Sequence, residues 1–275
     1  MFASCKGGIS VSDFRYGCAG MNLDHFLTAK AQGISYGELN FGGIYEMTKE
    51  DAEKYRNFSV ENNFPFEAAN CMIPGRLKVV GDEVDYDKID EYLEKAFDTA
   101  HYLGVEQVVF GSSGARNIPD GYDRDKAHEQ LKIYLRDHVA PLCDKYDMYC
   151  AIEDLSYSES NVFNTLEESY RMIEACGSDR IKALVDFYHF GKNKDSVDWL
   201  RRCGELITHI HTASVLNNRH FPEPNDGEDY SVQVNLLREI GYNKRQARIS
   251  FEAGIKDGKS LEDCFGDSVR LFKAL

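Results

Sequence analysis

The amino-acid sequence predicts an α/β protein that folds as a single (β/α)₈ barrel over residues 1–275. Short apolar segments alternate with longer amphipathic segments along the whole chain, which is typical of βα units around a parallel sheet. No Pro-, Gly- or Ser-rich linker interrupts this alternation. An open doubly wound sheet would usually carry a glycine-rich phosphate loop after its first strand, and Gly7-Gly8 is too short for one. The pattern therefore favours a closed barrel.

The predicted strands are the short apolar runs, and the predicted helices are the longer segments between them. The strands are expected at Phe2–Cys5, Ile34–Leu39, Phe66–Cys71, Gln107–Phe110, Met148–Glu153, Ala183–Asp186, Leu206–His211 and Arg248–Glu252. The helices are expected at Asn22–Gln32, Lys49–Asn62, Tyr86–Leu103, Arg124–Tyr146, Thr165–Ala175, Ser196–Cys203, Ser231–Ile240 and Leu261–Lys273.

Local signals support individual helices. In the segment that ends at Leu103, apolar residues recur at three- and four-residue steps and form one stripe, and Gly104 follows as a stop signal. Asn164-Thr165 before two glutamates predicts the start of a later helix, which Gly177 would end.

Composition excludes several classes of protein. The net charge of −14 argues against a nucleic-acid partner, and no run of about 18 apolar residues could span a membrane. The first eight residues lack the basic and apolar regions of a secretory signal. Eight scattered cysteines without a C-x-x-C pair suit reduced thiols better than disulfides or a zinc ribbon. These features predict a cytoplasmic protein.

Potential metal ligands terminate four successive predicted strands. In a (β/α)₈ barrel the active site lies at the carboxyl ends of the strands, so side chains at these positions can converge. The residues concerned are Glu153, Asp186, His211 and Glu252. Three carboxylates and one imidazole suit Mn²⁺, Mg²⁺ or Co²⁺ better than an ion that prefers thiolates.

A structural role must be weighed against this interpretation. A single carboxylate at a strand end commonly caps the next helix or pairs with a basic residue. Four ligand-type residues at the ends of four successive strands would instead bring several negative charges together. This raises the free energy of the folded protein unless a cation binds between them. His189 lies three residues after Asp186, close to the predicted site. His209 shares a strand face with His211 and is expected to be a hydrogen-bonded residue of the barrel interior.

Four motifs resemble a known family. They are the segment from Glu153 through Glu159 to Asn164-Thr165, the pair Asp186-x-x-His189, the pair His209-x-His211, and the final Glu252. In this order and with these intervals they resemble the D-tagatose/D-psicose 3-epimerases and their sugar isomerase relatives, within the xylose isomerase-like TIM barrel superfamily. The loop from Phe110 to Gly121 is similar to the fourth-strand loop of sugar phosphate isomerases of this superfamily.

The resemblance implies a role for each matched residue. One divalent metal ion would be held by Glu153, Asp186, His211 and Glu252. Glu153 and Glu252 would also form an acid/base pair on opposite faces of a small carbohydrate substrate. Its hydroxyl groups would be contacted by Glu159, His189 and Arg219. Related barrels are often dimers or tetramers, and the sequence leaves open whether this chain forms a homo-oligomer.

Two departures from the family concern the substrate pocket. Asp154-Leu155-Ser156-Tyr157 stands where the family usually has Pro-Leu-Asn-Arg, and Arg219 comes eight residues after His211, on a longer loop. Arg219 could close over the substrate or be a solvated surface residue. The altered turn predicts that the preferred sugar differs from free psicose or tagatose.

The expected reaction is proton abstraction next to a carbonyl group. A metal ion would stabilise the enediolate, and a glutamate on each face would allow removal and return of the proton. The same residues could support 3-epimerisation or aldose–ketose isomerisation. A metal-dependent lyase or dehydratase of an inositol-like or oxidised sugar is the main alternative. An apurinic-site endonuclease would need more strand-end histidines and a basic groove, and a sugar-binding barrel without activity would not need all four ligands.

Overall fold

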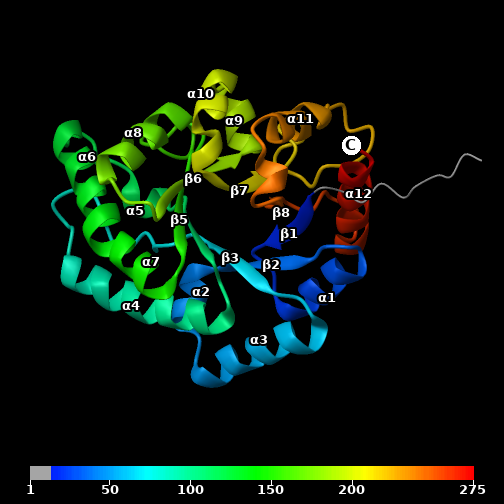
Figure 1. Cartoon of the computed structure of the whole chain (residues 1–275), viewed down its shortest axis with the longest axis horizontal. Coiled ribbons are helices and arrows are strands. Elements are labelled where there is room, and N and C mark those ends of the chain that lie inside the picture. Colours follow the sequence, from blue (N-terminus) through cyan, green and yellow to red (C-terminus); the bar gives the residue numbers. More distant parts are fainter. Residues whose placement is uncertain (1–13) are drawn as a thin grey trace, which may run out of the picture.

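Eight parallel strands close into a barrel in the order β1 to β8, which confirms the predicted fold class (Figure 1). The computed structural model describes residues 14–275. The strands are β1 Arg15–Ala19, β2 Tyr36–Asn40, β3 Phe66–Asn70, β4 Gln107–Phe110, β5 Tyr149–Glu153, β6 Ile181–Asp186, β7 Ile207–Thr212 and β8 Arg248–Phe251. From β2 onward, the predicted strands agree with these bounds to within two residues.

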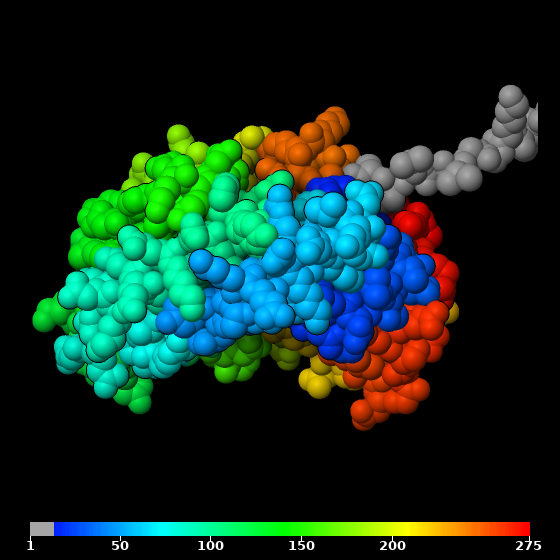
Figure 2. Space-filling model, turned by 90° about the horizontal axis from the view of Figure 1, so that it is seen from below, coloured from blue at the N-terminus to red at the C-terminus, as the bar shows by residue number. Residues whose placement is uncertain are grey.

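Helices surround the barrel, as Figure 1 shows. The longer ones are α1 Leu23–Ala31, α3 Lys49–Asn62, α4 Tyr86–Leu103, α6 Arg124–Ile133, α7 Ala140–Tyr146, α8 Leu166–Cys176, α10 Val197–Cys203, α11 Ser231–Glu239 and α12 Leu261–Ala274. Figure 2 shows the flank covered by the first half of the chain, in blue and cyan, with the red C-terminal helix α12 beside the blue segment. This contact closes the ring of helices.

The first strand differs from the prediction. The predicted strand Phe2–Cys5 lies outside the described residues, and β1 at Arg15–Ala19 closes the barrel by pairing with both β2 and β8. This strand begins with a charged residue and contains Gly17, so it has no continuous apolar run. A Cβ atom on Gly17 would lie 2.2 Å from the ring of Tyr36. The glycine that weakens the strand pattern is therefore required by packing.

The helices also differ from the prediction in detail. The segment expected as one helix at Arg124–Tyr146 contains a π-helical turn at Tyr134–Val139 between α6 and α7. Pro141, near the start of α7, cannot donate a backbone hydrogen bond to the preceding turn. Three short helices were not predicted: α2 Phe41–Glu46, α5 Ser113–Arg116 and α9 Phe187–Asn193. Each lies directly after a strand, at the carboxyl end of the barrel.

Predicted helix ends are confirmed where a cap specifies them. Gly104 follows α4 in the left-handed region with φ 89°, and Gly177 ends α8 with φ 61°. The Thr165 side chain accepts a hydrogen bond from the backbone N–H of Glu168. The seven cysteines among residues 14–275 are free thiols. Within the same residues, no helix combines the length and the apolar character needed to cross a membrane.

Candidate metal centre

The four strand-end residues singled out in the sequence meet at the carboxyl end of the barrel. One ligand atom from each of Glu153, Asp186, His211 and Glu252 lies within 4.8 Å of the corresponding atoms of the other three. His211 is central, because its Nδ1 lies 3.1 Å from Glu153 Oε1 and 3.2 Å from Glu252 Oε2. Parallel neighbouring strands β5 to β8 bring these side chains together.

This cluster is buried. Glu153, Asp186 and His211 are at most 5% exposed, and the Glu252 side chain is 22% exposed. Burial raises the pKa of Asp186 above its ordinary value. For Glu252 burial acts in the same direction, but the positive charges of His211 and Arg219 outweigh it and lower the pKa to about 2.

The donor set fits a divalent cation. Three carboxylates gather around one imidazole, and the basic side chains in contact with them are His211, Arg219 and, at Asp186, His189. Buried carboxylates are costly unless they are paired or bind a metal. Oxygen donors with a single nitrogen are typical ligands of Mn²⁺, Mg²⁺ and related ions. A proton on His211 Nδ1 would lie between the carboxylates of Glu153 and Glu252. A cation bound to Nδ1 and to both carboxylates would occupy the same position.

Glu38 orients the histidine of this cluster. It lies in β2 with its side chain fully buried, and its Oε1 accepts a hydrogen bond from His211 Nε2 at 2.9 Å. Because Nε2 carries the proton in this bond, Nδ1 is the nitrogen that faces the carboxylates. A carboxylate behind a ligand histidine is the usual arrangement at protein metal sites. The sequence pattern does not single out Glu38, because this residue lies inside β2 and does not terminate an apolar run.

His209 is an interior residue, as predicted. It is fully buried, and its Nε2 lies 2.8 Å from the second oxygen of Glu38. Its Nδ1 has no hydrogen-bond partner. Glu38 therefore accepts a hydrogen bond from Nε2 of each histidine of β7. Both N···O distances lie in the usual range for hydrogen bonds.

Two further residues at strand ends position the glutamates. Asn70, the last residue of β3, donates a hydrogen bond from Nδ2 to Glu252 Oε1 at 2.8 Å. Gly111 follows β4, and a Cβ atom there would lie 1.9 Å from Glu153 Oε2, so only glycine leaves room for this carboxylate. Asn70 ends an apolar strand and could have been found by the same rule that identified Glu252.

A buried arginine fixes the backbone at Glu153. Arg116 is fully buried, and its guanidinium donates to the carbonyl oxygen of Glu153 at 2.7 Å and to that of Phe110. The guanidinium also lies over the rings of Phe110 and Phe163, with its carbon 5.3 and 5.2 Å from their centroids. Burial lowers the pKa of Arg116 to about 10. No sequence pattern marked this arginine.

Asp186 serves the helix and the cluster together. Its Oδ1 accepts a hydrogen bond from the backbone N–H of Tyr188 at 2.9 Å and caps α9. Its Oδ2 points toward the cluster and lies 3.1 Å from Nη2 of Arg219. The capping and site interpretations considered for this residue are therefore compatible.

The predicted substrate-contacting residues lie beside the cluster. Arg219 and Glu159, with both glutamates of the cluster, line a pocket of about 680 Å³. His189 is fully buried, and its Nδ1 accepts a hydrogen bond from the backbone N–H of Ser156 at 3.1 Å. Its Nε2 lies 3.1 Å from Nη1 of Arg219, which can only donate, and 3.5 Å from Asp186 Oδ2.

The position of Arg219 excludes one of its two alternatives, that of a solvated surface residue. Its Nη2 lies 2.5 Å from Glu252 Oε2, and its guanidinium carbon is 5.0 Å from the centroid of the Tyr188 ring. The side chain is 28% exposed and thus reaches into the pocket instead of extending into solvent. Its backbone and that of Asn218 have positive φ values of 62° and 55°, so the loop turns sharply here.

Comparisons with known proteins agree with this architecture. Over 138 residues the chain is 25% identical to D-psicose 3-epimerase of Agrobacterium fabrum, which covers 50% of this chain and 44% of that protein. Over 174 residues it is 25% identical to inosose isomerase of Bacillus velezensis, covering 59% of each chain. The aligned segments thus span about half of these relatives.

Solved structures share the fold over nearly the whole chain. The 3-keto-D-glucoside 4-epimerase of E. coli superposes with a TM-score of 0.81 at 17% identity and covers 95% of this chain and 100% of its own. The IOLI protein, solved with a zinc atom, superposes with a TM-score of 0.70 at 14% identity, covering 93% and 95%. The family model described as the xylose isomerase-like TIM barrel matches residues 26–275. The chain belongs to the xylose isomerase-like TIM barrel family.

Proposed function

We propose that this protein is a divalent-metal-dependent epimerase or isomerase of a small sugar, acting by proton transfer at a carbon next to a carbonyl group. The observation that carries the proposal is the convergence of Glu153, Asp186, His211 and Glu252 within 4.8 Å at the base of a pocket of about 680 Å³. The similarity to D-psicose 3-epimerases and to inosose isomerase supports the sugar as substrate.

The cluster would hold one Mn²⁺, Mg²⁺ or Co²⁺ ion through these four residues. When bound, such an ion would polarise the substrate carbonyl and stabilise the negative charge that develops on its oxygen. Zn²⁺ also accepts carboxylate and imidazole ligands, so the donor set defines the class of ion and not the element.

Glu153 and Glu252 would be the acid/base pair. One glutamate removes the proton from the carbon, and the other returns a proton to the opposite face, which inverts the centre. Asn70 holds Glu252 through a hydrogen bond to Oε1, and Arg116 holds the carbonyl of Glu153. Asn70 therefore orients the carboxylate of Glu252, whereas Arg116 fixes the backbone from which the Glu153 side chain extends; proton transfer requires such positioning.

Three residues would hold the sugar hydroxyls. His189 would contact the sugar through Nε2, which lies 3.1 Å from Nη1 of Arg219, because the Ser156 N–H occupies its Nδ1. Glu159 accepts from Ser156 Oγ at 3.2 Å and keeps its second oxygen, 3.7 Å from Nη1 of Arg219, on the pocket side. Arg219 would donate to substrate oxygens and close the pocket over them.

Deuterium exchange from solvent tests the proposal and identifies the substrate. The metal-loaded protein is incubated in D₂O with a panel of ketoses and inososes, and the products are followed by NMR. Deuterium at one carbon next to the carbonyl, with a new epimer or isomer, is expected. Release of water with an unsaturated product would identify the lyase or dehydratase alternative. Absence of exchange across the panel would reject proton abstraction from these sugars.

Replacing Arg219 by alanine should weaken substrate binding without removing the metal. The change removes donors from the pocket, so we expect KM to rise or kcat to fall by about tenfold or more. Metal content should stay the same, because none of the four proposed ligands is altered. Arg171→Ala is a matched control, because that guanidinium is 73% exposed on α8. Unchanged kinetics for Arg219→Ala would remove this residue from the substrate site.

Replacing Glu38 by glutamine should lower metal affinity by about 10–100-fold. Glutamine has one oxygen and one NH₂ group, so it can accept from only one of the two histidines that Glu38 now binds through separate oxygens. Titration calorimetry with Mn²⁺ measures this affinity without any substrate. Glu67→Gln serves as control, because Glu67 is a buried carboxylate bound to Arg15 near the opposite end of the barrel. Equal affinities for Glu38→Gln and wild type would contradict the orienting role.

A further inference from the structure

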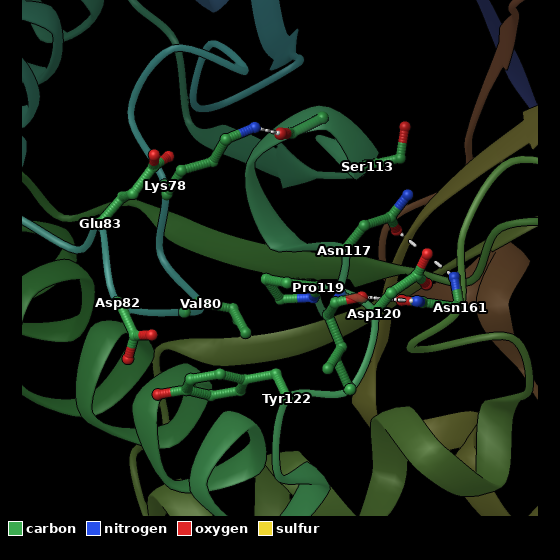
Figure 3. A pocket seen from close by; sticks show the side chains of 14 residues that line it. Lys78, Val80, Asp82, Glu83, Ser113, Asn117, Pro119, Asp120, Tyr122 and Asn161 are labelled. Atoms are coloured by element: carbon green, nitrogen blue, oxygen red, sulfur yellow. Dashed lines mark hydrogen bonds between the residues drawn. The ribbon is translucent and has the colours of Figure 1, made fainter.

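A second cavity of about 940 Å³ adjoins the pocket of about 680 Å³ at the candidate metal centre (Figure 3). We call the smaller space the catalytic pocket. The walls of the larger cavity are the loop between β3 and α4, the loop between β4 and α6, and Asn161 from the loop after β5. These loops follow the carboxyl ends of their strands, so the cavity opens on the same end of the barrel as the site. We call it the adjoining cavity.

Both cavities share part of their walls. Ser113 and Gly114, at the start of α5, line the catalytic pocket and the adjoining cavity. Asn117 is a second link, because its Nδ2 lies 3.4 Å from the carbonyl oxygen of Glu159 in the catalytic pocket. A molecule that reaches past α5 would occupy the two spaces together.

Side-chain amides fix the walls of the adjoining cavity. Asn161 brackets the backbone of Ile118, accepting from its N–H at 2.9 Å and donating to its carbonyl at 2.8 Å. Gln130 brackets Gly81 in the same way at 2.8 and 2.9 Å. Such two-point contacts hold both loops in place, so the cavity is a formed site and not a gap between mobile segments.

The lining of the adjoining cavity is polar and acidic. Asp82, Glu83 and Asp120 contribute three carboxylates, whereas Lys78 is the cation among the lining residues and already donates to the carbonyl of Gly114 at 2.7 Å. Figure 3 shows Asp82 and Glu83 on one side of the view and Asn117 and Asn161 on the other. A phosphate group would be repelled by this excess of negative charge. Uncharged hydroxyl groups would find acceptors in these carboxylates and donors in the hydroxyls of Ser113 and Tyr122.

We propose that the substrate is an uncharged sugar linked to a second sugar unit, which occupies the adjoining cavity while the reacting unit lies over the metal centre. The inference rests on the proposed function, because it assigns the reacting unit to the catalytic pocket. Each cavity has the volume of an ordinary small-molecule site. The exposed Pro119 and the half-buried Tyr122 supply apolar surface for the C–H face of the second unit.

Binding of unreactive alcohols tests this substrate class without turnover. Maltitol and isomaltitol each join a glucose unit to glucitol, and neither has a reactive carbonyl. Calorimetry with the Mn²⁺-loaded full chain compares them with glucitol and with glucitol 6-phosphate. At least one of the two glucosyl-glucitols should bind about tenfold or more tightly than glucitol, because its second unit adds contacts in the adjoining cavity. Glucitol 6-phosphate should gain nothing.

Two variants locate the added affinity. Asp82 is exposed at the adjoining cavity, and Asp82→Trp would fill that space, so it should abolish the advantage of the glucosyl-glucitol and leave glucitol binding unchanged. Asp179→Trp makes the same change at an exposed position in the loop before β6, at the other end of the barrel, and should preserve the advantage. Thermal unfolding confirms that each variant is folded.

Several results would overturn the inference. These are equal or undetectable binding of both glucosyl-glucitols relative to glucitol, tighter binding of glucitol 6-phosphate, or an advantage that survives in Asp82→Trp. Failure of the proposed function would be different. In that case a glucosyl-glucitol would bind in the expected manner, but no keto-sugar, free or glycosylated, would exchange hydrogen with solvent.

Discussion

Glu153→Gln and Glu252→Gln are each expected to lower turnover by about 10²–10⁴-fold, the usual contribution of a general acid or base. Glutamine keeps the size of the side chain but cannot accept a proton from carbon. Asn70 can still donate to the amide oxygen at 252, although the amide nitrogen there then faces His211 and Arg219, and Arg116 still binds the backbone at 153. The loss should therefore reflect chemistry more than a displaced loop.

The measurement must separate chemistry from metal loss. Turnover and metal content are determined on the same samples, and activity is expressed per bound ion. Glu67→Gln is the matched control, because it makes the same change at a buried carboxylate that binds Arg15 and Arg248 away from the site. That variant is expected to lose stability but to keep near-normal turnover. Near-normal turnover of either Glu153→Gln or Glu252→Gln would remove that residue from the mechanism.

Removal of divalent ions is expected to abolish turnover, and Mn²⁺, Mg²⁺ or Co²⁺ should restore it. Without a divalent ion, the three carboxylates of the cluster are in contact with the basic side chains of His211, Arg219 and His189. Substrate would then lack the positive charge that stabilises an oxygen anion.

Thermal unfolding supplies a second readout for the same experiment. An ion that binds only the folded protein stabilises it by about 2.7 kcal/mol at a concentration one hundred times its Kd. The melting temperature should therefore rise with added ion in wild type, and much less in Asp186→Asn, which loses one negative ligand. Full activity of the ion-free protein, with no shift in melting temperature, would show that the cluster does not work through a metal.

The sequence predicted elements whose signals are local. The α4 helix was placed correctly because its apolar stripe and Gly104 both specify it, and α8 because Thr165 and Gly177 mark its ends. Strand β1 was misplaced because Arg15 and Gly17 interrupt its pattern, and the reason for Gly17 is the Tyr36 ring on the neighbouring strand. The sequence of one strand does not reveal its contacts with residues on a neighbouring strand.

The same limit applies to the site. Glu153, Asp186, His211 and Glu252 stood out because each terminates a strand predicted from the sequence. Glu38 reaches His209 and His211 across the barrel interior, a contact between β2 and β7 that no local spacing reveals. Arg219 lies on a loop, so its direction became clear only from its contact with Glu252.

Anomalous diffraction from crystals grown with Mn²⁺ tests the central claim most directly. One manganese peak is expected between Glu153, Asp186, His211 and Glu252, with ligand distances of about 2.0–2.6 Å and with His211 bound through Nδ1. In that complex Arg219 should no longer contact both Asp186 and Glu252, since the ion takes over their charge. A protein saturated with Mn²⁺ that shows no peak among these four residues, or a peak elsewhere only, would contradict the account.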